Sequence, residues 1–290
     1  MTNYKNPTLG THALHEMIAV CGAVGGAGRT SVTVNLAASL AKKKRNIRIV
    51  DGDLQFGDTA LALDLQPPQT LKDIAERVDE RDFQDYWTVH DSGIELLAAP
   101  YRPEHADLFT ADMLASLIES VKADSDILLV DTEAGLTESS LQVMEKADRI
   151  LLVTTPRMAA LKHTRLMVET LQVLDMKHKV EVIVNQFTTG SVMKASEIRD
   201  LIQTENIHFL PYEYKGISES LDLGIPLVES HPKHSYSIQI GQLAEGLFPT
   251  IQMKREKYSV VNKVINRLKG SRGSRHEFIG KTSIKDSGRS

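Results

Sequence analysis

At 290 residues, with 41% hydrophobic and 25% charged residues, the chain has the composition of a soluble globular protein with a large core. The formal net charge of −4 gives no overall basic field for nucleic acid, and the one cysteine, Cys21, excludes a disulfide within the chain. No stretch approaches the ~20 apolar residues of a membrane span, and Met1–His15 lacks the apolar core of a signal peptide. We therefore expect a cytoplasmic protein.

Short apolar runs alternate with helical patterns along the chain. The runs are mostly continuous, which is typical of strands buried on both faces of a parallel sheet. The expected strands are Met17–Ala23, Ile47–Asp51, Ile94–Ala98, Ile127–Asp131, Ile150–Thr154, Val180–Asn185 and Ile207–Leu210, and the expected helices include Thr30–Lys43, Ala111–Val121, Leu161–Leu174 and Met193–Thr204. This order predicts an α/β fold with a doubly wound, mostly parallel sheet.

The composition divides the chain into a polar lead over residues 1–15, an α/β domain over 16–249 and a basic tail over 250–290. From Lys254 to Arg275 the tail has eight Lys and Arg residues and one acid, Glu256. Apolar residues recur there at helical spacing: Tyr258, Val261, Val264, Ile265 and Leu268.

This basic amphipathic pattern favours a peripheral contact with a membrane surface or with the groove of a protein partner. One alternative is a helix packed on its own domain and followed by a disordered segment. A contact with DNA is the less favoured alternative, because few aromatic residues accompany the basic ones.

The first candidate site is the glycine-rich turn after the first expected strand. Gly25, Gly26, Ala27 and Gly28 lead into Arg29-Thr30-Ser31 and a helical pattern. Glycines let backbone N–H groups approach phosphates, and a helix N-terminus favours anions. The stretch approximates G-x-x-x-x-G-K-[ST], with Ala23 at its first glycine and Arg29 at its lysine. A plain strand–turn–helix of a dinucleotide fold is the alternative, although the Thr30-Ser31 pair fits a phosphate loop better.

Two acidic segments follow at the carboxyl ends of later strands, where α/β proteins bind ligands. Asp51 and Asp53 lie in Asp51-Gly-Asp53-Leu-Gln-Phe-Gly-Asp58, and Asp131 follows the apolar run Ile127–Val130. A carboxylate in these places can support Mg²⁺ or orient an attacking water, and the Thr30 hydroxyl suits direct Mg²⁺ coordination.

Together these segments resemble the MinD/ParA superfamily of deviant Walker A ATPases, over about Glu16 to Leu247. Further markers are Asn35-Leu-Ala37, Val153-Thr-Thr-Pro156, Val184-Asn-Gln186, Leu210-Pro211 and Gly224-Ile-Pro-Leu-Val228. The stretches Asp51–Leu65 and Leu97–Pro100 look most similar to the CpaE/TadZ branch, which helps to assemble pili of the tight-adherence (Tad) type. The flagellar regulators FlhG and FleN are close competitors.

The resemblance implies a P-loop NTPase of the SIMIBI type that uses ATP and Mg²⁺. Backbone N–H groups from Gly25 to Thr30 and Ser31 would hold the phosphates, and Asn185 and Pro211 would lie at adenine. Thr30 would bind Mg²⁺, supported by Asp51 and Asp131, and Asp53 would position the attacking water. The family also implies a homodimer.

Two positions depart from the family pattern. The lysine that reaches across the family's dimer is replaced by Val24, and the loop lysine is replaced by Arg29. Arg is larger and forked, so this exchange is not conservative in a tight loop. We therefore expect weakened nucleotide binding and slow or absent hydrolysis.

The resulting hypothesis is an ATP-binding dimer on the inner face of the cytoplasmic membrane, which positions or assembles a surface machine such as a Tad pilus. The alternatives are an active ATPase that controls flagellar number, the division site or DNA partitioning, and a structural adaptor that binds no nucleotide.

Overall fold

The computed structural model describes residues 15–77 and 83–249. The chain divides into two compact units at Phe248, and all described residues except Pro249 belong to the first. The predicted tail helix, with Tyr258, Val261, Val264, Ile265 and Leu268, lies outside the described residues, as does the lead up to Leu14. No helix in the described part is long and apolar enough to cross a membrane.

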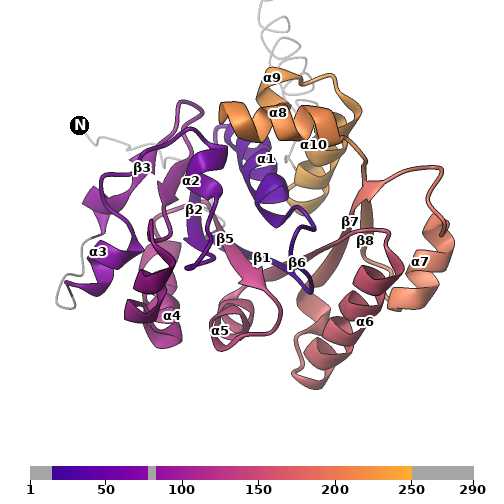
Figure 1. The fold of residues 1–290 in the computed structure, drawn as a ribbon, viewed down its shortest axis with the longest axis horizontal. Helices are drawn as coiled ribbons and strands as arrows, with labels where there is room; N and C mark the ends of the chain where they lie inside the picture. Colours follow the sequence, from indigo (N-terminus) through magenta and orange to yellow (C-terminus); the bar gives the residue numbers. More distant parts are fainter. Residues whose placement is uncertain (1–14, 78–82, 250–290) are drawn as a thin grey trace, which may run out of the picture. The chain divides into compact units, whose positions relative to one another are not determined.

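One eight-stranded sheet organises the described unit, with the strand order β3-β4-β2-β5-β1-β6-β7-β8 (Figure 1). The strands are β1 (Glu16–Gly22), β2 (Ile47–Gly52), β3 (Thr88–Val89), β4 (Glu95–Leu97), β5 (Ile127–Ala134), β6 (Arg149–Thr154), β7 (Val180–Phe187) and β8 (Ile207–Pro211). All neighbours pair in parallel except β3, which is antiparallel to β4. The predicted doubly wound α/β fold is therefore confirmed.

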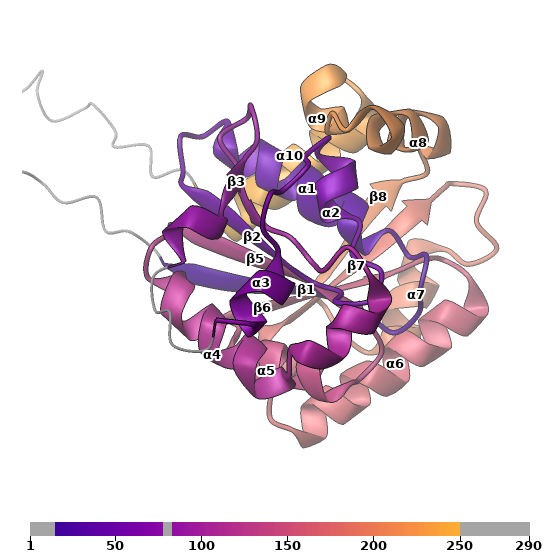
Figure 2. The ribbon, with the colours of Figure 1, turned by 60° about the vertical axis from the view of Figure 1, so that its left-hand side comes forward.

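Helices cover both faces of the sheet (Figures 1 and 2). They are α1 (Arg29–Ala41), α2 (Thr59–Ala62), α3 (Leu71–Ala75), α4 (Ala111–Lys122), α5 (Glu138–Lys146), α6 (Met158–Val173), α7 (Ala195–Ile202), α8 (Tyr214–Leu223), α9 (Leu227–Ser230) and α10 (Ser235–Leu247). Three short 3₁₀ turns are η1 (Gln84–Tyr86), η2 (Pro103–Leu108) and η3 (Lys177–Lys179). One face carries α1, α2, α8, α9 and α10, and the other carries α3 to α7.

The two faces of the sheet bury separate hydrophobic clusters. In β1, Met17 and Ala19 face the cluster under α4 to α7, whereas Ile18 and Val20 face the cluster under α1 and α10. Because side chains of a strand point alternately to opposite faces, a strand covered on both sides must be apolar throughout. This explains the continuous apolar runs in the sequence.

Candidate nucleotide site at the carboxyl edge of the sheet

The glycine-rich turn joins β1 to α1 and leaves an open backbone cradle. Gly26 and Gly28 have φ angles of 71° and 91°, in the left-handed region that favours glycine. A Cβ atom added at Gly25 or Gly26 would meet no atom within 4 Å, so the space beside this backbone is free. The N-cap of α1, Gly28, has no side-chain cap, so the first N–H groups of α1 remain available to an anion.

Asn185 holds the far side of this turn. Its Nδ2 donates to the Ala27 carbonyl at 2.9 Å, and its Oδ1 accepts from the Gln186 backbone N–H at 2.9 Å. A Cβ at Gly28 would lie only 2.4 Å from Asn185 Nδ2, so only glycine fits there. Gly28, Ser31, Asn185 and Pro211 line one narrow cleft, which brings the expected base-side residues together.

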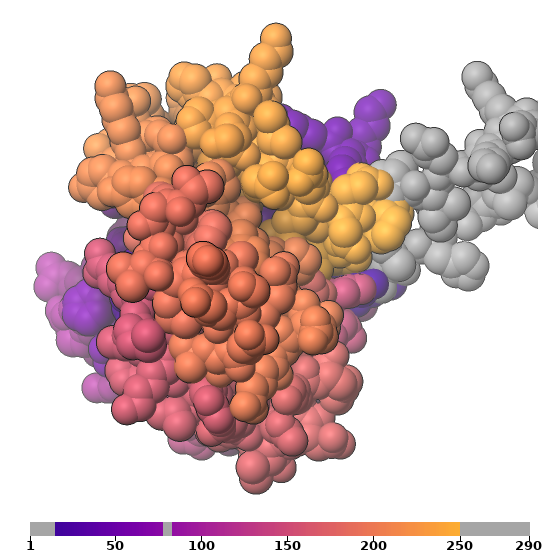
Figure 3. Space-filling view, turned by 90° about the vertical axis from the view of Figure 1, so that its right-hand side faces the viewer, coloured from indigo at the N-terminus to yellow at the C-terminus, as the bar shows by residue number. Residues whose placement is uncertain are grey.

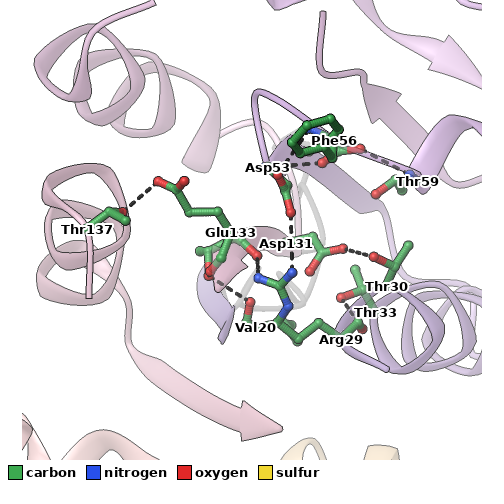
Figure 4. Close-up of polar contacts among 12 residues, drawn as sticks. Val20, Arg29, Thr30, Thr33, Asp53, Phe56, Thr59, Asp131, Glu133 and Thr137 are labelled. Carbon is green, nitrogen blue, oxygen red and sulfur yellow. Dashed lines mark hydrogen bonds and ion pairs between the residues drawn. The ribbon is translucent and has the colours of Figure 1, made fainter. Parts of the chain in front are cut away.

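Arg29 turns back across the edge of the sheet (Figure 4). Its guanidinium forms an ion pair with Asp53 at 3.3 Å and also donates to the Thr132 carbonyl. The two side chains are only 12% and 19% exposed, so solvent screens this pair weakly. The one cation of the turn is therefore engaged by an acid and a carbonyl, beside the open cradle.

Thr30, Asp131 and Asp51 lie deeper at the same edge. The Thr30 hydroxyl donates to Asp131 Oδ2 at 2.7 Å (Figure 4), and the Thr59 backbone N–H donates to Asp51 Oδ2 at 3.1 Å. Asp51 and Asp131 are register partners on β2 and β5, so the pairing of these strands brings their buried carboxyl groups together.

Burial raises the pKa of both carboxyl groups above the usual range of an aspartate. The charge of Asp131 raises the pKa of Asp51 further, whereas the Thr30 hydrogen bond and the charge of Arg29 act against the rise at Asp131. Ionisation of both acids is therefore unfavourable at this edge of the sheet, and a bound cation would favour their ionised forms.

A divalent cation fits this set of donors. Asp131 Oδ1 is buried and has no hydrogen-bond partner, although its other oxygen is bonded to Thr30. Mg²⁺ takes few protein ligands and completes its shell with water and phosphate oxygens. Among residues 15–77 and 83–249, no group of three or more His, Cys, Asp or Glu residues is placed to hold a metal ion.

Some contacts of the site could not be predicted from the sequence. The Thr132 carbonyl, which accepts from Arg29, carries no side-chain signal. Gly57 lies directly against the Asp51 carboxyl group. A Cβ atom at this position would lie only 2.5 Å from Asp51 Oδ2, so a larger residue would not fit. The spacing Asp51-x₅-Gly57 could have indicated this approach. Val24, the residue expected from the resemblance to replace the crossing lysine, is partly buried against the α1 side of the core.

The chain is similar to known proteins over most of its length. The family described as an AAA domain matches residues 15–184. The septum site-determining protein MinD of Synechocystis is 26% identical over 268 residues, which cover 89% of this chain and 100% of that protein. The antiactivator FleN of Pseudomonas aeruginosa is 32% identical over 141 residues, covering 48% of this chain and 50% of FleN.

Solved structures share the fold. MinD of Pyrococcus horikoshii, complexed with Mg-ADP, has a TM-score of 0.73 and 24% identity, covering 81% of this chain and 96% of that one. A ParA family ATPase of Chlorobium tepidum has a TM-score of 0.74 and 23% identity, covering 79% of this chain and 98% of that one. At these identities the likeness concerns the fold alone.

Proposed function

Because the chain belongs to the family described as an AAA domain and to the MinD/ParA superfamily of P-loop ATPases, we propose that it binds Mg-ATP, dimerises and positions a machine at the cell surface. In this proposal it hydrolyses ATP slowly or not at all, and it acts as a lasting landmark. The open glycine cradle and the uncapped start of α1 support phosphate binding.

The observation that carries the proposal is the engagement of Arg29. Its guanidinium neutralises Asp53, the acid expected to position the attacking water, and it lies against Thr132 instead of extending into the cradle. Phosphate binding must compete with Asp53 for this cation. Val24 supplies no second cation, so stabilisation of charge in the transition state is reduced.

Thr30 and Asp131 are the residues that would hold Mg²⁺, and Asp51 would support them by its charge. The Thr30 hydroxyl would coordinate the ion directly, and the free oxygen of Asp131 would accept from a bound water. Bound Mg²⁺ would neutralise charge on the phosphates and on this acidic edge.

The finer proposal is a role in a Tad-type pilus, as in the CpaE/TadZ branch. Its support is the resemblance of Asp51–Leu65 and Leu97–Pro100 to that branch. Exposed Phe56, 70% accessible beside Asp53, suits the contact of a second copy or a protein partner. The predicted tail helix would provide peripheral attachment to the cytoplasmic membrane.

Calorimetric titration of the full chain with ATP and ADP, with and without Mg²⁺, tests the nucleotide proposal. Micromolar, Mg²⁺-dependent ATP binding with turnover far below that of active relatives supports it. Turnover at the rate of active relatives favours the active ATPase of the flagellar, division or partitioning class. No binding by calorimetry and no shift in melting temperature favours the structural adaptor.

Deletion of the gene tests the cellular role. Loss or mislocation of pili, with flagellar number and septum position unchanged, supports the pilus proposal. Altered flagellar number or minicells would contradict it.

A further inference from the structure

A narrow cleft opens behind the glycine-rich turn, between the ends of β7 and β8 and the helices α1, α8 and α10. It holds about 60 Å³ and is lined by Gly28, Ser31, Asn185, Gln186, Pro211, Tyr212, Glu213, Tyr214, Ile217 and Tyr236. Figure 3 views the molecule from the β8 side, where α7, α8 and α10 form the surface. The residues predicted for phosphate and base recognition account for only part of this lining.

Among the residues that line the cleft, Tyr236 has no predicted role in the recognition of phosphate or base. It is 1% exposed, at the start of α10, and its hydroxyl is buried without a hydrogen-bond partner in the described part of the chain. Buried hydroxyl groups are normally satisfied, so an unpartnered one that lines a cleft indicates a missing partner.

Two polar side chains of the cleft, Asn185 and Glu213, are already engaged. Both polar atoms of Asn185 have backbone partners. Glu213 accepts from the Gly216 N–H at 3.0 Å and pairs with His234 Nε2 at 3.0 Å. Tyr236 therefore offers a free hydroxyl, able to donate and to accept, in the same cleft as two side chains that are held in place.

The charge of the cleft favours a neutral group over a phosphate as the partner of the Tyr236 hydroxyl. No lysine or arginine lines it, and Glu213 contributes a carboxylate. Tyr212 and Tyr214, 52% and 69% exposed, add aromatic faces at the same opening. Aromatic faces beside a neutral hydrogen-bonding group suit a nucleobase, which stacks through its ring and pairs through its edge.

We propose that Tyr236 recognises the base of the bound nucleotide, its hydroxyl hydrogen-bonding the base edge while Tyr212 or Tyr214 covers the ring. This inference rests on the proposed nucleotide binding. It adds a specificity-determining residue from α10 to the site formed at the ends of β1, β2, β5 and β7. The cleft is smaller than a base, so the edge of the ring enters it and the tyrosines move to cover the rest.

Tyr236→Phe tests the proposal, because it removes one oxygen atom and keeps the packing. The melting temperature without nucleotide should stay equal or rise, since an unsatisfied hydroxyl is removed. The dissociation constant for Mg-ATP should increase about three- to tenfold, the range expected for one neutral hydrogen bond. The dissociation constant for inorganic tripolyphosphate, which has no base, should be unchanged.

Tyr86→Phe is the matched control, since Tyr86 is 3% exposed and lies in η1, away from the cleft. It should leave both dissociation constants unchanged. If wild-type protein binds ATP and Tyr236→Phe binds it equally well, the base contact is overturned and nucleotide binding stands. If wild-type protein binds neither ligand, the nucleotide proposal itself fails and this inference fails with it.

Discussion

At the scale of single residues, Arg29 differs from the lysine expected at this position both in its size and in the number of groups that it can contact. A guanidinium can bond two acceptors at once, and Arg29 bonds Asp53 and the Thr132 carbonyl together. Gly22 makes room for the stem, because a Cβ there would lie 3.2 Å from Arg29 Cδ. A lysine ammonium is a compact charge that could bond only part of this set.

Arg29→Lys should therefore release Asp53 and increase ATP hydrolysis about fivefold, the factor expected from the loss of a competing ion pair of about 1 kcal/mol. Phosphate release under saturating Mg-ATP measures the rate, and calorimetry measures affinity. Arg29→Ala is the control: it frees Asp53 but removes the cation, so hydrolysis should not increase. An Arg29→Lys protein no faster than wild type would contradict this account.

Asp131 provides a second test at this scale. Replacement by Asn removes one of two neighbouring buried carboxyl groups, so the free energy of unfolding without nucleotide should increase by about 1–3 kcal/mol. The Mg²⁺-dependent part of the stabilisation by ATP should disappear. Urea denaturation, with ATP and either Mg²⁺ or EDTA, measures both effects. A less stable nucleotide-free Asp131→Asn protein would show that this carboxylate stabilises the empty site.

Sequence alone placed Thr30, Asp53 and Asp131 at one edge of the sheet, because each follows a strand whose apolar run is easily recognised. It could not give the Arg29–Asp53 pair, since that contact depends on the direction of a long side chain. It also missed Tyr236, because α10 was not among the predicted helices and an unpartnered hydroxyl has no sequence pattern.

At the scale of elements, the position of α1 depends on a polar clamp. Asn35 is 1% exposed; its Nδ2 donates to the Ser31 carbonyl at 2.9 Å, and its Oδ1 accepts from the Val228 N–H at 3.0 Å. The clamp ties α1, which begins at the glycine cradle, to the four-residue helix α9. The marker Asn35-Leu-Ala37 thus has a structural reason here.

Asn35→Ala should lower the free energy of unfolding by about 1–3 kcal/mol, because the buried Val228 N–H loses its acceptor. The midpoint of urea denaturation measures this change. Ser120→Ala on α4 is the control, since that hydroxyl is exposed and bonds its own helix at Ser116. Equal effects of the two substitutions would mean that the clamp contributes little.

The observed strands and helices differ from the predicted ones in their ends and in their number. The core strands were predicted because burial on two faces produces apolar runs, and β5 and β7 extend beyond those runs into polar residues of the site. The strand β3 has two residues and α9 has four, too short for any periodicity to appear. The predicted helix 193–204 is shorter, over Ala195–Ile202, because Gln203 adopts a left-handed conformation with φ of 60°.

At the scale of the whole molecule, a row of charged side chains ties together the strands at one side of the sheet. Arg149 on β6 pairs with Glu16 on β1 at 3.2 Å and with Glu181 on β7 at 3.0 Å, and His208 on β8 approaches Glu181 at 2.7 Å. These residues lie near the starts of their strands, and Glu181 links the edge strand β8 to the rest of the sheet.

This row predicts how stability depends on pH. The His208 hydrogen bond, assisted by Arg149, lowers the pKa of Glu181 below its ordinary value. A carboxyl group with a lowered folded-state pKa adds stability above its unfolded pKa of about 4.3 and loses it as the pH falls through the folded value. Glu181→Gln should therefore lower the free energy of unfolding by about 1 kcal/mol at pH 7, and the difference from wild type should shrink below pH ~4. Urea denaturation of both proteins at a series of pH values measures this difference, with Glu219→Gln on the exposed surface as the control. A difference that is constant with pH would mean that the charge of Glu181 does not hold β8 to the sheet, and that apolar packing alone keeps this edge strand in place.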